Sequence, residues 1–362
     1  MKNIVQQITS NIKNYLAPLP ALPQNPVLAK YAKNLGNHLY GAMQFLNNTT
    51  VNLARKKLKL NTLPWYLFIG SIAAGKTTFL ANSGVRFILD KKMKSKNIQD
   101  IPPSETCDWW ITPNAVIIDI PGHYVAYKEK MSSIPNKLWQ HFLMLLQKKR
   151  GAAGLNGVIV AISLPELLNQ QNDPKLASML EYRLAELRQK FGAQLSFQFV
   201  ITQCDLLPGF LEFFSDYSSE ELSQAWGVPF PRLEKHDSLV DAFNSRFNVL
   251  IKRLNQQVLW RLHHEKNPHA KVYIKDFPLQ LEHFKENMAG LLKILTKNED
   301  TPFYLKGVYL TSAFQREQTE QQSQSTQLIL ASEQHALSII QAPTAPVQAY
   351  FIKQFILQGL TS

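Results

Sequence analysis

The feature that most constrains this 362-residue chain is the segment GSIAAGKT at residues 70–77. It matches the pattern G-x-x-x-x-G-K-[ST], in which two glycines let the backbone curl so that successive N–H groups point at one phosphate. An apolar run at residues 64–70 leads into it, and a helical pattern begins at residues 77–80. This order predicts a buried strand, a phosphate-binding loop and a helix whose positive N-terminal end faces an anion.

Four further short apolar runs alternate with helical patterns, which is typical of a parallel sheet covered by helices on both faces. Hydrophobic residues make up 45% of the chain and charged residues 18%, so a large core is available. We therefore predict an α/β fold of the P-loop NTPase type, similar to GTPases, with a helical insertion. The runs are residues 115–118, 157–163, 197–202 and 307–311, and the clearest helical patterns are residues 138–147 and 175–191.

Changes in pattern divide the chain into four parts. Between the fourth and fifth apolar runs there is little strand character, and the patterns at residues 237–264 and 279–295 are helical. After the fifth run, a Gln/Ser/Thr-rich segment at residues 315–327 is expected to be a mobile loop, and a helical pattern follows at residues 347–360. The predicted parts are an N-terminal helical segment and linker at 1–60, the P-loop NTPase core at 61–205, a helical insertion at 206–305, and the last core strand with C-terminal helices at 306–362.

Within the loop, the side chains have distinct expected roles. Lys76 places a positive charge between the β- and γ-phosphates of a nucleoside triphosphate, and the Thr77 hydroxyl can ligate Mg²⁺. We therefore predict Mg²⁺ together with GTP or ATP as the ligands. The residues expected to bind the phosphates are Gly70, Ser71, Ile72, Ala73, Ala74, Gly75, Lys76, Thr77 and Thr78.

A second element, DIPG at residues 119–122, follows the second apolar run and matches the D-x-x-G pattern of GTP-binding proteins. A carboxylate at a strand end beside a phosphate loop can hold Mg²⁺, so Asp119 joins Thr77 as a predicted metal ligand. The backbone N–H of Gly122 can bond to the γ-phosphate and so sense its presence. A plain strand-end turn is the alternative interpretation of Asp119.

Two residues near this element have the chemistry that hydrolysis needs. The imidazole of His123 could orient the attacking water, while an ordinary exposed histidine is the alternative. Thr106 is placed like a switch threonine that reaches Mg²⁺ when a γ-phosphate is bound. Ser104 competes for that role, and a solvent-facing loop threonine is the other alternative. The predicted catalytic residues are Lys76, Thr106 and His123, and Thr106 is also a predicted metal ligand.

A base-reading element is expected at residues 202–205, TQCD, which close the fourth apolar run and resemble [NT]-K-x-D. In that element the aspartate, here Asp205, accepts two hydrogen bonds from guanine that adenine cannot supply. Gln203 stands where the lysine stem would pack over the base, so guanine selectivity is expected but weakened. The other predicted base contacts are Thr202 and, in a TSA segment that resembles an S-A element, Ser312 and Ala313.

The net charge of +12 indicates an anionic partner such as a nucleotide, a nucleic acid or an acidic membrane face. Basic clusters at residues 55–59, 91–96 and 148–150 could face anionic lipid or be solvated surface charge. Nucleic-acid binding is not expected, because no DNA- or RNA-binding motif is recognisable. Two cysteines exclude a disulfide framework and a Cys-rich zinc site, and residues 263–269 are expected to form a polar helix end rather than a histidine zinc site. No apolar run is long enough to cross a membrane.

With these motifs in place, the sequence resembles the IcmF/TssM family, the inner-membrane components of type IVB and type VI secretion systems. Its CDWW and DLLPGF segments are more distinctive than the phosphate loop, which many families share. It departs from the family at Gln203, where many type VI members have lysine, and at His123, where many have arginine. The residues that carry the resemblance are 64–66, 75–78, 81–84, 107–110, 156–159, 202–210, 213–214, 225–227 and 307–312.

The resemblance implies a soluble portion of a membrane protein, lying at the cytoplasmic face of the bacterial inner membrane within an envelope-spanning secretion machine. The implied neighbour is a small inner-membrane protein of the DotU/TssL type, alongside other components of the complex. Together with the motifs, it favours a nucleoside-triphosphate-binding switch that prefers GTP and hydrolyses it slowly. The alternative is a structural scaffold with a vestigial or non-hydrolysing nucleotide site, which the Gln203 departure supports.

Overall fold

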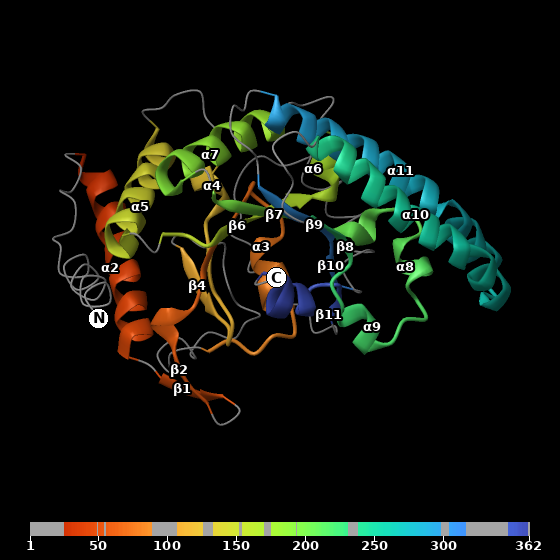
Figure 1. Cartoon of the computed structure of the whole chain (residues 1–362), viewed down its shortest axis with the longest axis horizontal. Helices are drawn as coiled ribbons and strands as arrows, with labels where there is room; N and C mark the ends of the chain where they lie inside the picture. Colours follow the sequence, from red (N-terminus) through yellow and green to blue (C-terminus); the bar gives the residue numbers. More distant parts are fainter. Residues whose placement is uncertain are drawn as a thin grey trace, which may run out of the picture.

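The computed structural model of the chain places a twisted sheet between layers of helices (Figure 1). Thr106, Ser104, the basic cluster at 91–96 and nearly all of the predicted loop at 315–327 lie outside the residues that it describes. The described residues are 25–48, 50–53, 56–88, 107–125, 133–151, 154–169, 175–192, 194–230, 238–297, 304–315 and 347–360.

The central sheet has seven strands in the order β4-β5-β3-β6-β7-β9-β8. Its five inner strands are parallel, and they correspond to the five apolar runs of the sequence. Every residue of β3 is buried, which explains why that run lacks polar alternation. The mixed α/β fold with a mostly parallel sheet is therefore confirmed. The parallel strands are β3 (Trp65–Gly70), β5 (Val116–Asp119), β6 (Gly157–Ser163), β7 (Ser196–Thr202) and β9 (Leu305–Leu310).

Two antiparallel edge strands depart from the predicted all-parallel sheet. Strand β4 (Asp108–Ile111) pairs with β5, and β8 (Gly227–Pro229) pairs with β9. The second of these lies inside the segment predicted to be a purely helical insertion, so that prediction was incomplete. Both strands are only three or four residues long, too short to produce a clear period-two pattern.

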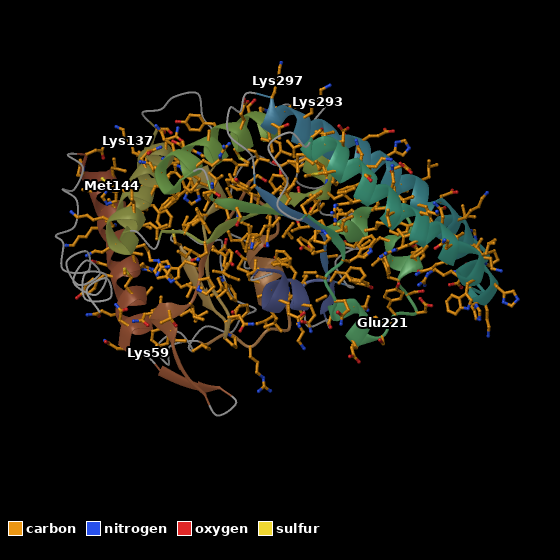
Figure 2. The ribbon with its side chains drawn as sticks, in the orientation of Figure 1. Lys59, Lys137, Met144, Glu221, Lys293 and Lys297 are labelled. Atoms are coloured by element: carbon orange, nitrogen blue, oxygen red, sulfur yellow. The ribbon has the colours of Figure 1, made fainter. Side chains whose placement is uncertain are left out.

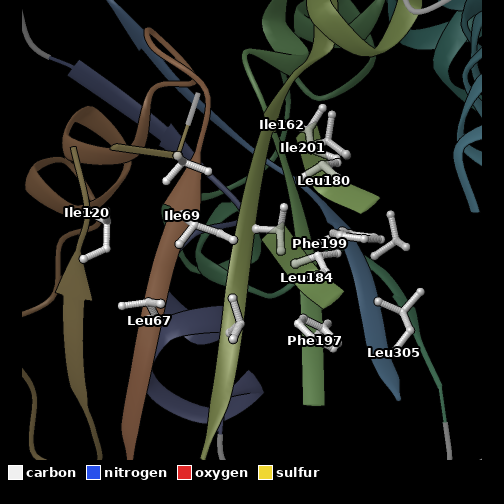
Figure 3. Close-up of a cluster of buried hydrophobic side chains, with 14 of the residues drawn as sticks. Leu67, Ile69, Ile120, Ile162, Leu180, Leu184, Phe197, Phe199, Ile201 and Leu305 are labelled. Carbon is white, nitrogen blue, oxygen red and sulfur yellow. The ribbon is translucent and has the colours of Figure 1, made fainter. Parts of the chain in front are cut away.

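Side chains of β3 point alternately to the two faces of the sheet, and each face has its own core. Trp65, Leu67 and Ile69 belong to the larger core, whereas Tyr66 and Phe68 belong to the smaller one. The larger core includes leucines of α7, and Figure 3 shows Leu180 and Leu184 beside Phe197 and Phe199 of β7. The helices that contribute to the larger core include α2 (Pro26–Asn48), α5 (Ile134–Arg150) and α7 (Lys175–Phe191).

The opposite face is covered by α3 (Lys76–Ala81) and by the C-terminal segment. Phe79 of α3 packs edge-on against Phe68 of the sheet, with ring centroids 5.5 Å apart, and against Phe355, with centroids 6.0 Å apart. The phosphate-loop segment thus leads into a helix that is anchored on the sheet by aromatic contacts. This anchoring fixes the position of the first turn, which carries Lys76 and Thr77.

The helical insertion forms an antiparallel hairpin of two long helices that projects beyond the sheet (Figure 1). Phe247 and Phe284 pack between them with ring centroids 5.3 Å apart. Its base is an aromatic cluster in which Phe210, Phe214 and Trp226 contact Phe277. The insertion contains α8 (Phe210–Phe213), α9 (Ser219–Ser223), α10 (Leu239–His264) and α11 (Pro268–Thr296), and a lysine near the end of α11, Lys293, points outward (Figure 2).

Two segments predicted to be helical contain strands instead. Residues 50–53 and 56–59 form a pair of antiparallel strands, β1 (Thr50–Leu53) and β2 (Lys56–Lys59). Residues 347–350 form β11 (Val347–Tyr350), which pairs with β10 (Ser312–Gln315) before a short π-helix at Phe355–Gly359. Cross-strand pairing, which helical periodicity does not report, decides the structure in both cases. The pairing is local between β1 and β2, and it joins distant residues between β10 and β11.

The basic cluster at residues 148–150 is not a free surface patch. Lys149 is only 8% exposed, and the guanidinium of Arg150 lies 4.4 Å from the ring centroid of Trp65. Arg150 also donates a hydrogen bond to the Gly154 carbonyl, 3.1 Å away. Two of its three cations are therefore partly or wholly engaged within the fold, and whether this cluster faces lipid stays a prediction. Among the described residues, no helix has the length and apolar character needed to cross a membrane.

Candidate functional site

The loop between β3 and α3 curls at the carboxyl edge of the sheet. Its backbone takes left-handed conformations at Ala73, with φ of 63°, and at Gly75, with φ of 70°. Glycine adopts this region without steric penalty, whereas alanine is strained there. The second glycine of the motif therefore suits the backbone conformation at position 75, and the loop turns sharply there.

Lys76 begins α3 and turns back over this loop. Its side chain is only 7% exposed, and its ammonium donates hydrogen bonds to the carbonyls of Gly70 and Ser71, each 3.3 Å away. Burial lowers the pKa of the ammonium, and the nearby carboxylates of Asp119 and Glu166 raise it. The charge is thus held within the curl of the loop, between carboxylates contributed by two other elements.

Asp119 lies next to Thr77 because β5 runs parallel to β3 and ends beside it. The Thr77 hydroxyl donates a hydrogen bond to Oδ2 of Asp119 over 3.0 Å. The carboxylate is 2% exposed, and its other oxygen, Oδ1, has no hydrogen-bond partner among the described residues. Burial raises its pKa to about 7, against the opposing effects of Lys76 and the Thr77 hydrogen bond. A buried carboxylate oxygen without a partner is costly unless a cation or a proton occupies it.

Gly122, in α4 (Gly122–Val125), packs directly against the loop. A Cβ at this position would lie 2.6 Å from the Ser71 carbonyl oxygen and 2.7 Å from the Ile72 nitrogen. Only glycine fits there without displacing the loop. The next residue, His123, is exposed and its ring stands edge-on to Tyr124, with centroids 4.6 Å apart. Its role in orienting water stays a prediction.

Strand β7 ends against the other side of the loop. The Thr202 hydroxyl donates a hydrogen bond to the Ala74 carbonyl over 2.9 Å, and the Gln203 amide nitrogen lies 3.4 Å from the Ala73 carbonyl. Gln203 has a left-handed backbone, with φ of 59°. These contacts place the TQCD segment beside the loop at residues 70–77.

The two predicted base-reading segments also meet. Asp205 accepts a hydrogen bond from the Ser312 hydroxyl, and the Cys204 N–H donates to the Thr311 carbonyl over 3.1 Å. Ser312 is buried, while Asp205 and Ala313 are half-buried. Segments more than a hundred residues apart in the chain are therefore adjacent, at the ends of the neighbouring strands β7 and β9.

Sequence reasoning missed two charged residues, one beside the loop and one beside the end of α4. Glu166, in α6 (Leu164–Leu168), accepts a hydrogen bond from the Ser71 hydroxyl over 2.6 Å. Arg183, on α7, is 1% exposed and donates to the carbonyls of Tyr124 and Val125 at the end of α4. The available signals were an acid just after the third apolar run and an arginine on the apolar stripe of a helix.

The alternative metal site in the helical insertion does not form. Residues 263–269 lie at the end of α10 and the start of α11, where His264 bonds to the Trp260 carbonyl over 2.8 Å. Within the described part of the chain, no cluster of three histidine, cysteine or acidic side chains is arranged to hold a metal ion.

These features define an α/β protein with a lysine-bearing loop and a buried carboxylate at the carboxyl edge of its parallel strands. The chain belongs to the IcmF-related family, since residues 133–360 match the model of the IcmF-related N-terminal domain. It is 33% identical over 267 residues to the type VI secretion system component TssM1 of Pseudomonas aeruginosa. That match covers 72% of this chain and 24% of the relative, so the chain spans about a quarter of the relative's length.

A solved structure with some similarity is a GTP-binding protein from the hyperthermophilic archaeon Sulfolobus solfataricus in complex with GDP. The match covers 51% of this chain and 52% of that one, at 14% identity and a TM-score of 0.24. A score this low does not indicate a shared fold.

Proposed function

We propose that this chain is a nucleoside-triphosphate-binding switch region with a P-loop NTPase core. The observation that carries the proposal is the juxtaposition of Lys76, curled over the loop, with the Thr77–Asp119 pair. These groups supply a cation for the phosphates and two oxygen ligands for Mg²⁺ within one turn of a helix and one neighbouring strand.

The Thr77–Asp119 pair fits a magnesium ion. Mg²⁺ prefers oxygen ligands and is usually held by one or two protein groups together with water and phosphate oxygens. Oδ1 of Asp119 is buried without a partner, and Oδ2 and the Thr77 hydroxyl lie 3.0 Å apart. A bound cation would satisfy the orphaned oxygen and lower the pKa of the carboxyl, which burial raises in the ligand-free protein.

We infer a preference for GTP over ATP from Asp205. Its bond to Ser312 holds the carboxylate in position, as a base-reading aspartate requires. Guanine offers that carboxylate two donors, whereas adenine presents no such pair of donors to it. Gln203 lies over the loop through its contact with Ala73, so its shorter stem leaves the base less well covered than lysine would.

Hydrolysis is expected to be slow. We assign water orientation to His123 and γ-phosphate sensing to Gly122 and Thr106, of which Thr106 lies outside the described residues. The arginine that contacts the segment after Asp119 is Arg183, and its guanidinium is already bonded to Tyr124, Val125, Asn136 and Glu186. It is therefore not available to stabilise charge on a transferring phosphate, which is worth several orders of magnitude in rate in fast GTPases.

The biological setting follows from the family. Because TssM1 is named as a type VI secretion component, we propose that this chain acts in a bacterial secretion complex at the cytoplasmic face of the inner membrane. A DotU/TssL-type membrane protein is the proposed neighbour. An anionic membrane surface remains a further proposed partner, in keeping with the net charge of +12.

A calorimetric titration tests the proposal directly. GTP and ATP are titrated into the protein with and without Mg²⁺, beside the Lys76→Ala variant and a control, Lys293→Ala, whose lysine is exposed on α11. We expect Mg²⁺-dependent binding that is tighter for GTP, abolished by Lys76→Ala and unchanged in the control. Equal binding by wild type and Lys76→Ala would show that the phosphate-loop assignment is wrong.

A second candidate function is a scaffold in which the nucleotide site is vestigial. Two observations favour it: Gln203 in the lysine position, and the Glu166 carboxylate bonded to the loop itself. Single-turnover measurements separate the candidates, because slow turnover that Lys76→Ala abolishes supports the switch. Partner binding that is tight and indifferent to nucleotide supports the scaffold.

A further inference from the structure

The proposed phosphate loop contacts an acidic side chain that no motif assigns. Strands β3 and β6 are parallel neighbours, with Gly70 beside Ala161, so the chain that follows each strand emerges at the same sheet edge. After β3 comes the loop, and after β6 comes α6, whose first turn holds Glu166. The Ser71 hydroxyl bonds to Glu166 over 2.6 Å, which joins the two segments.

This arrangement places Lys76 between two carboxylates. Asp119 comes from β5 on one side of β3, and Glu166 follows β6 on the other side. Both carboxylates act electrostatically on the Lys76 ammonium. The single cation of the loop thus already faces two negative groups before any ligand arrives, and an incoming polyphosphate would add more negative charge at the same place.

The two carboxylates have different expected partners. Asp119 has a fully buried oxygen without a protein partner and lies beside the Thr77 hydroxyl, so Mg²⁺ can satisfy it. Glu166 is only half-buried and contacts the loop through Ser71, at the start of the curl rather than at the first turn of α3. A cation held by Thr77 and Asp119 therefore compensates one carboxylate and leaves the other facing the phosphates.

We propose that Glu166 is an affinity-setting counter-charge, which pairs with the phosphate loop in the ligand-free protein and must move away from Ser71 and Lys76 for a polyphosphate to bind. The proposal rests on the proposed nucleotide-binding function and states how that site is regulated. In the ligand-free state the Glu166 carboxylate accepts the hydrogen bond of the Ser71 hydroxyl and partly neutralises the positive charge of Lys76. The ligand-free site therefore binds polyphosphates weakly, and a movement of α6 that takes Glu166 away from the loop would strengthen that binding.

The competing explanation is that Glu166 only supports the loop. Glutamine has the shape of glutamate and keeps an oxygen that can accept the Ser71 hydrogen bond, but it lacks the charge. The variant Glu166→Gln therefore distinguishes a role of Glu166 in supporting the loop by hydrogen bonding from a role of its negative charge. A purely supporting role predicts equal or weaker ligand binding in the variant.

The experiment is a titration of inorganic tripolyphosphate, GTP and guanosine in the presence of Mg²⁺. It compares wild type, Glu166→Gln, Ser71→Ala and the control Glu286→Gln, which removes an exposed acid on α11. We expect about tenfold tighter binding of tripolyphosphate and GTP by Glu166→Gln, the size expected when one like charge is removed near a partly solvated site. Ser71→Ala should tighten binding about threefold, because it releases the carboxylate without removing its charge.

The outcomes distinguish this inference from the proposed function. If wild type binds GTP and Lys76→Ala does not, but Glu166→Gln binds no more tightly than wild type, the counter-charge is refuted and the nucleotide site stands. If no variant, Glu166→Gln included, binds tripolyphosphate or GTP, the proposed function fails and this inference fails with it. A gain that Glu286→Gln reproduces would indicate a general charge effect and would also refute the role of Glu166.

Discussion

The two ends of the candidate site are built differently. At the phosphate end, Lys76 and Asp119 are almost fully buried, and burial shifts the pKa of both groups. At the base end, Asp205 and Gln203 are only half-buried, and they are held by hydrogen bonds to Ser312 and Ala73. The proposed phosphate end thus holds buried charges, including a carboxylate oxygen of Asp119 that has no hydrogen-bond partner among the described residues, whereas the proposed base end is held by hydrogen bonds within the protein.

Under the proposed function, this difference predicts which end of the site sets the affinity for nucleotides and which end sets the selectivity between them. Desolvated charges interact strongly with an ionic ligand, so changes at the phosphate end should alter the affinity for every polyphosphate alike. Polar groups that are partly solvated discriminate between ligands by modest amounts. Changes at the base end should therefore separate GTP from ATP and leave inorganic tripolyphosphate unaffected.

The largest effect is expected from Lys76→Met, which keeps the length of the apolar stem and removes the charge. The side chain is buried over the loop, so its loss leaves the phosphates without their nearest cation. We expect at least about a hundredfold weaker binding of GTP, ATP and tripolyphosphate, consistent with the loss of charge-assisted hydrogen bonds. Calorimetry measures all three, and a loss confined to GTP would break the proposed division between the two ends.

The second prediction concerns stability and pH at Asp119. Its pKa is about 7 in the folded protein, above the ordinary value for aspartate, because burial disfavours the ionised form. The folded state therefore binds more protons than the unfolded state between about pH 4 and 7, and this group destabilises the ligand-free fold increasingly as the pH rises through that window. Above about pH 7 the cost is constant.

Asp119→Asn removes that cost and should raise the melting temperature of the ligand-free protein by about 5 °C at pH 8, with little change at pH 4. The same variant should lose the stabilisation that Mg²⁺ and GTP give to wild type. Thermal unfolding at several pH values, with and without ligand, measures both effects. A variant that is destabilised at pH 8 would show that the carboxylate is compensated by the protein itself.

A smaller effect is expected at the base end from Asp205→Ala. Loss of the carboxylate removes the acceptor for guanine and frees Ser312 of its partner. We expect GTP to bind about tenfold more weakly, with ATP and tripolyphosphate unchanged. Competition titrations with the three ligands measure this. Ser312→Ala keeps the carboxylate of Asp205 but removes its hydrogen-bond donor, so it should weaken GTP binding less than Asp205→Ala does. Equal losses of GTP and ATP affinity in Asp205→Ala would contradict a base-reading role.

The central strands and helices could be predicted from the sequence because their hydrophobic patterns are long and regular. Strand β6 and helix α7 have the predicted bounds, since one is a continuous apolar run and the other a regular helical stripe. The edge strand β8 was not predicted, because three residues that include a glycine and a proline carry no pattern of their own. It exists only through pairing with β9, a contact between residues about eighty positions apart.

The same contrast applies to the candidate site. The motif spacing placed Lys76, Thr77 and Asp119 at strand ends, and parallel pairing of β3 with β5 brings those ends together. Glu166 carried no motif, and its contact with Ser71 depends on how α6 packs after β6. Similarly, no sequence pattern distinguishes Arg183 from an ordinary charged residue on a helix, and its bond to the Val125 carbonyl at the end of α4 depends on packing. Tertiary packing alone decides such contacts.

The smallest expected effect, and the finest test of the base end, is Gln203→Lys. The residue follows β7 with its amide over the Ala73 carbonyl, so a longer stem at the same position would extend toward the base and cover it. We expect about threefold tighter binding of GTP with no change for tripolyphosphate. Gln203→Met, which adds apolar stem without charge, is the matched control. Tighter binding of tripolyphosphate would mean that the new ammonium reaches the phosphates, and the two ends of the site would then not be separate.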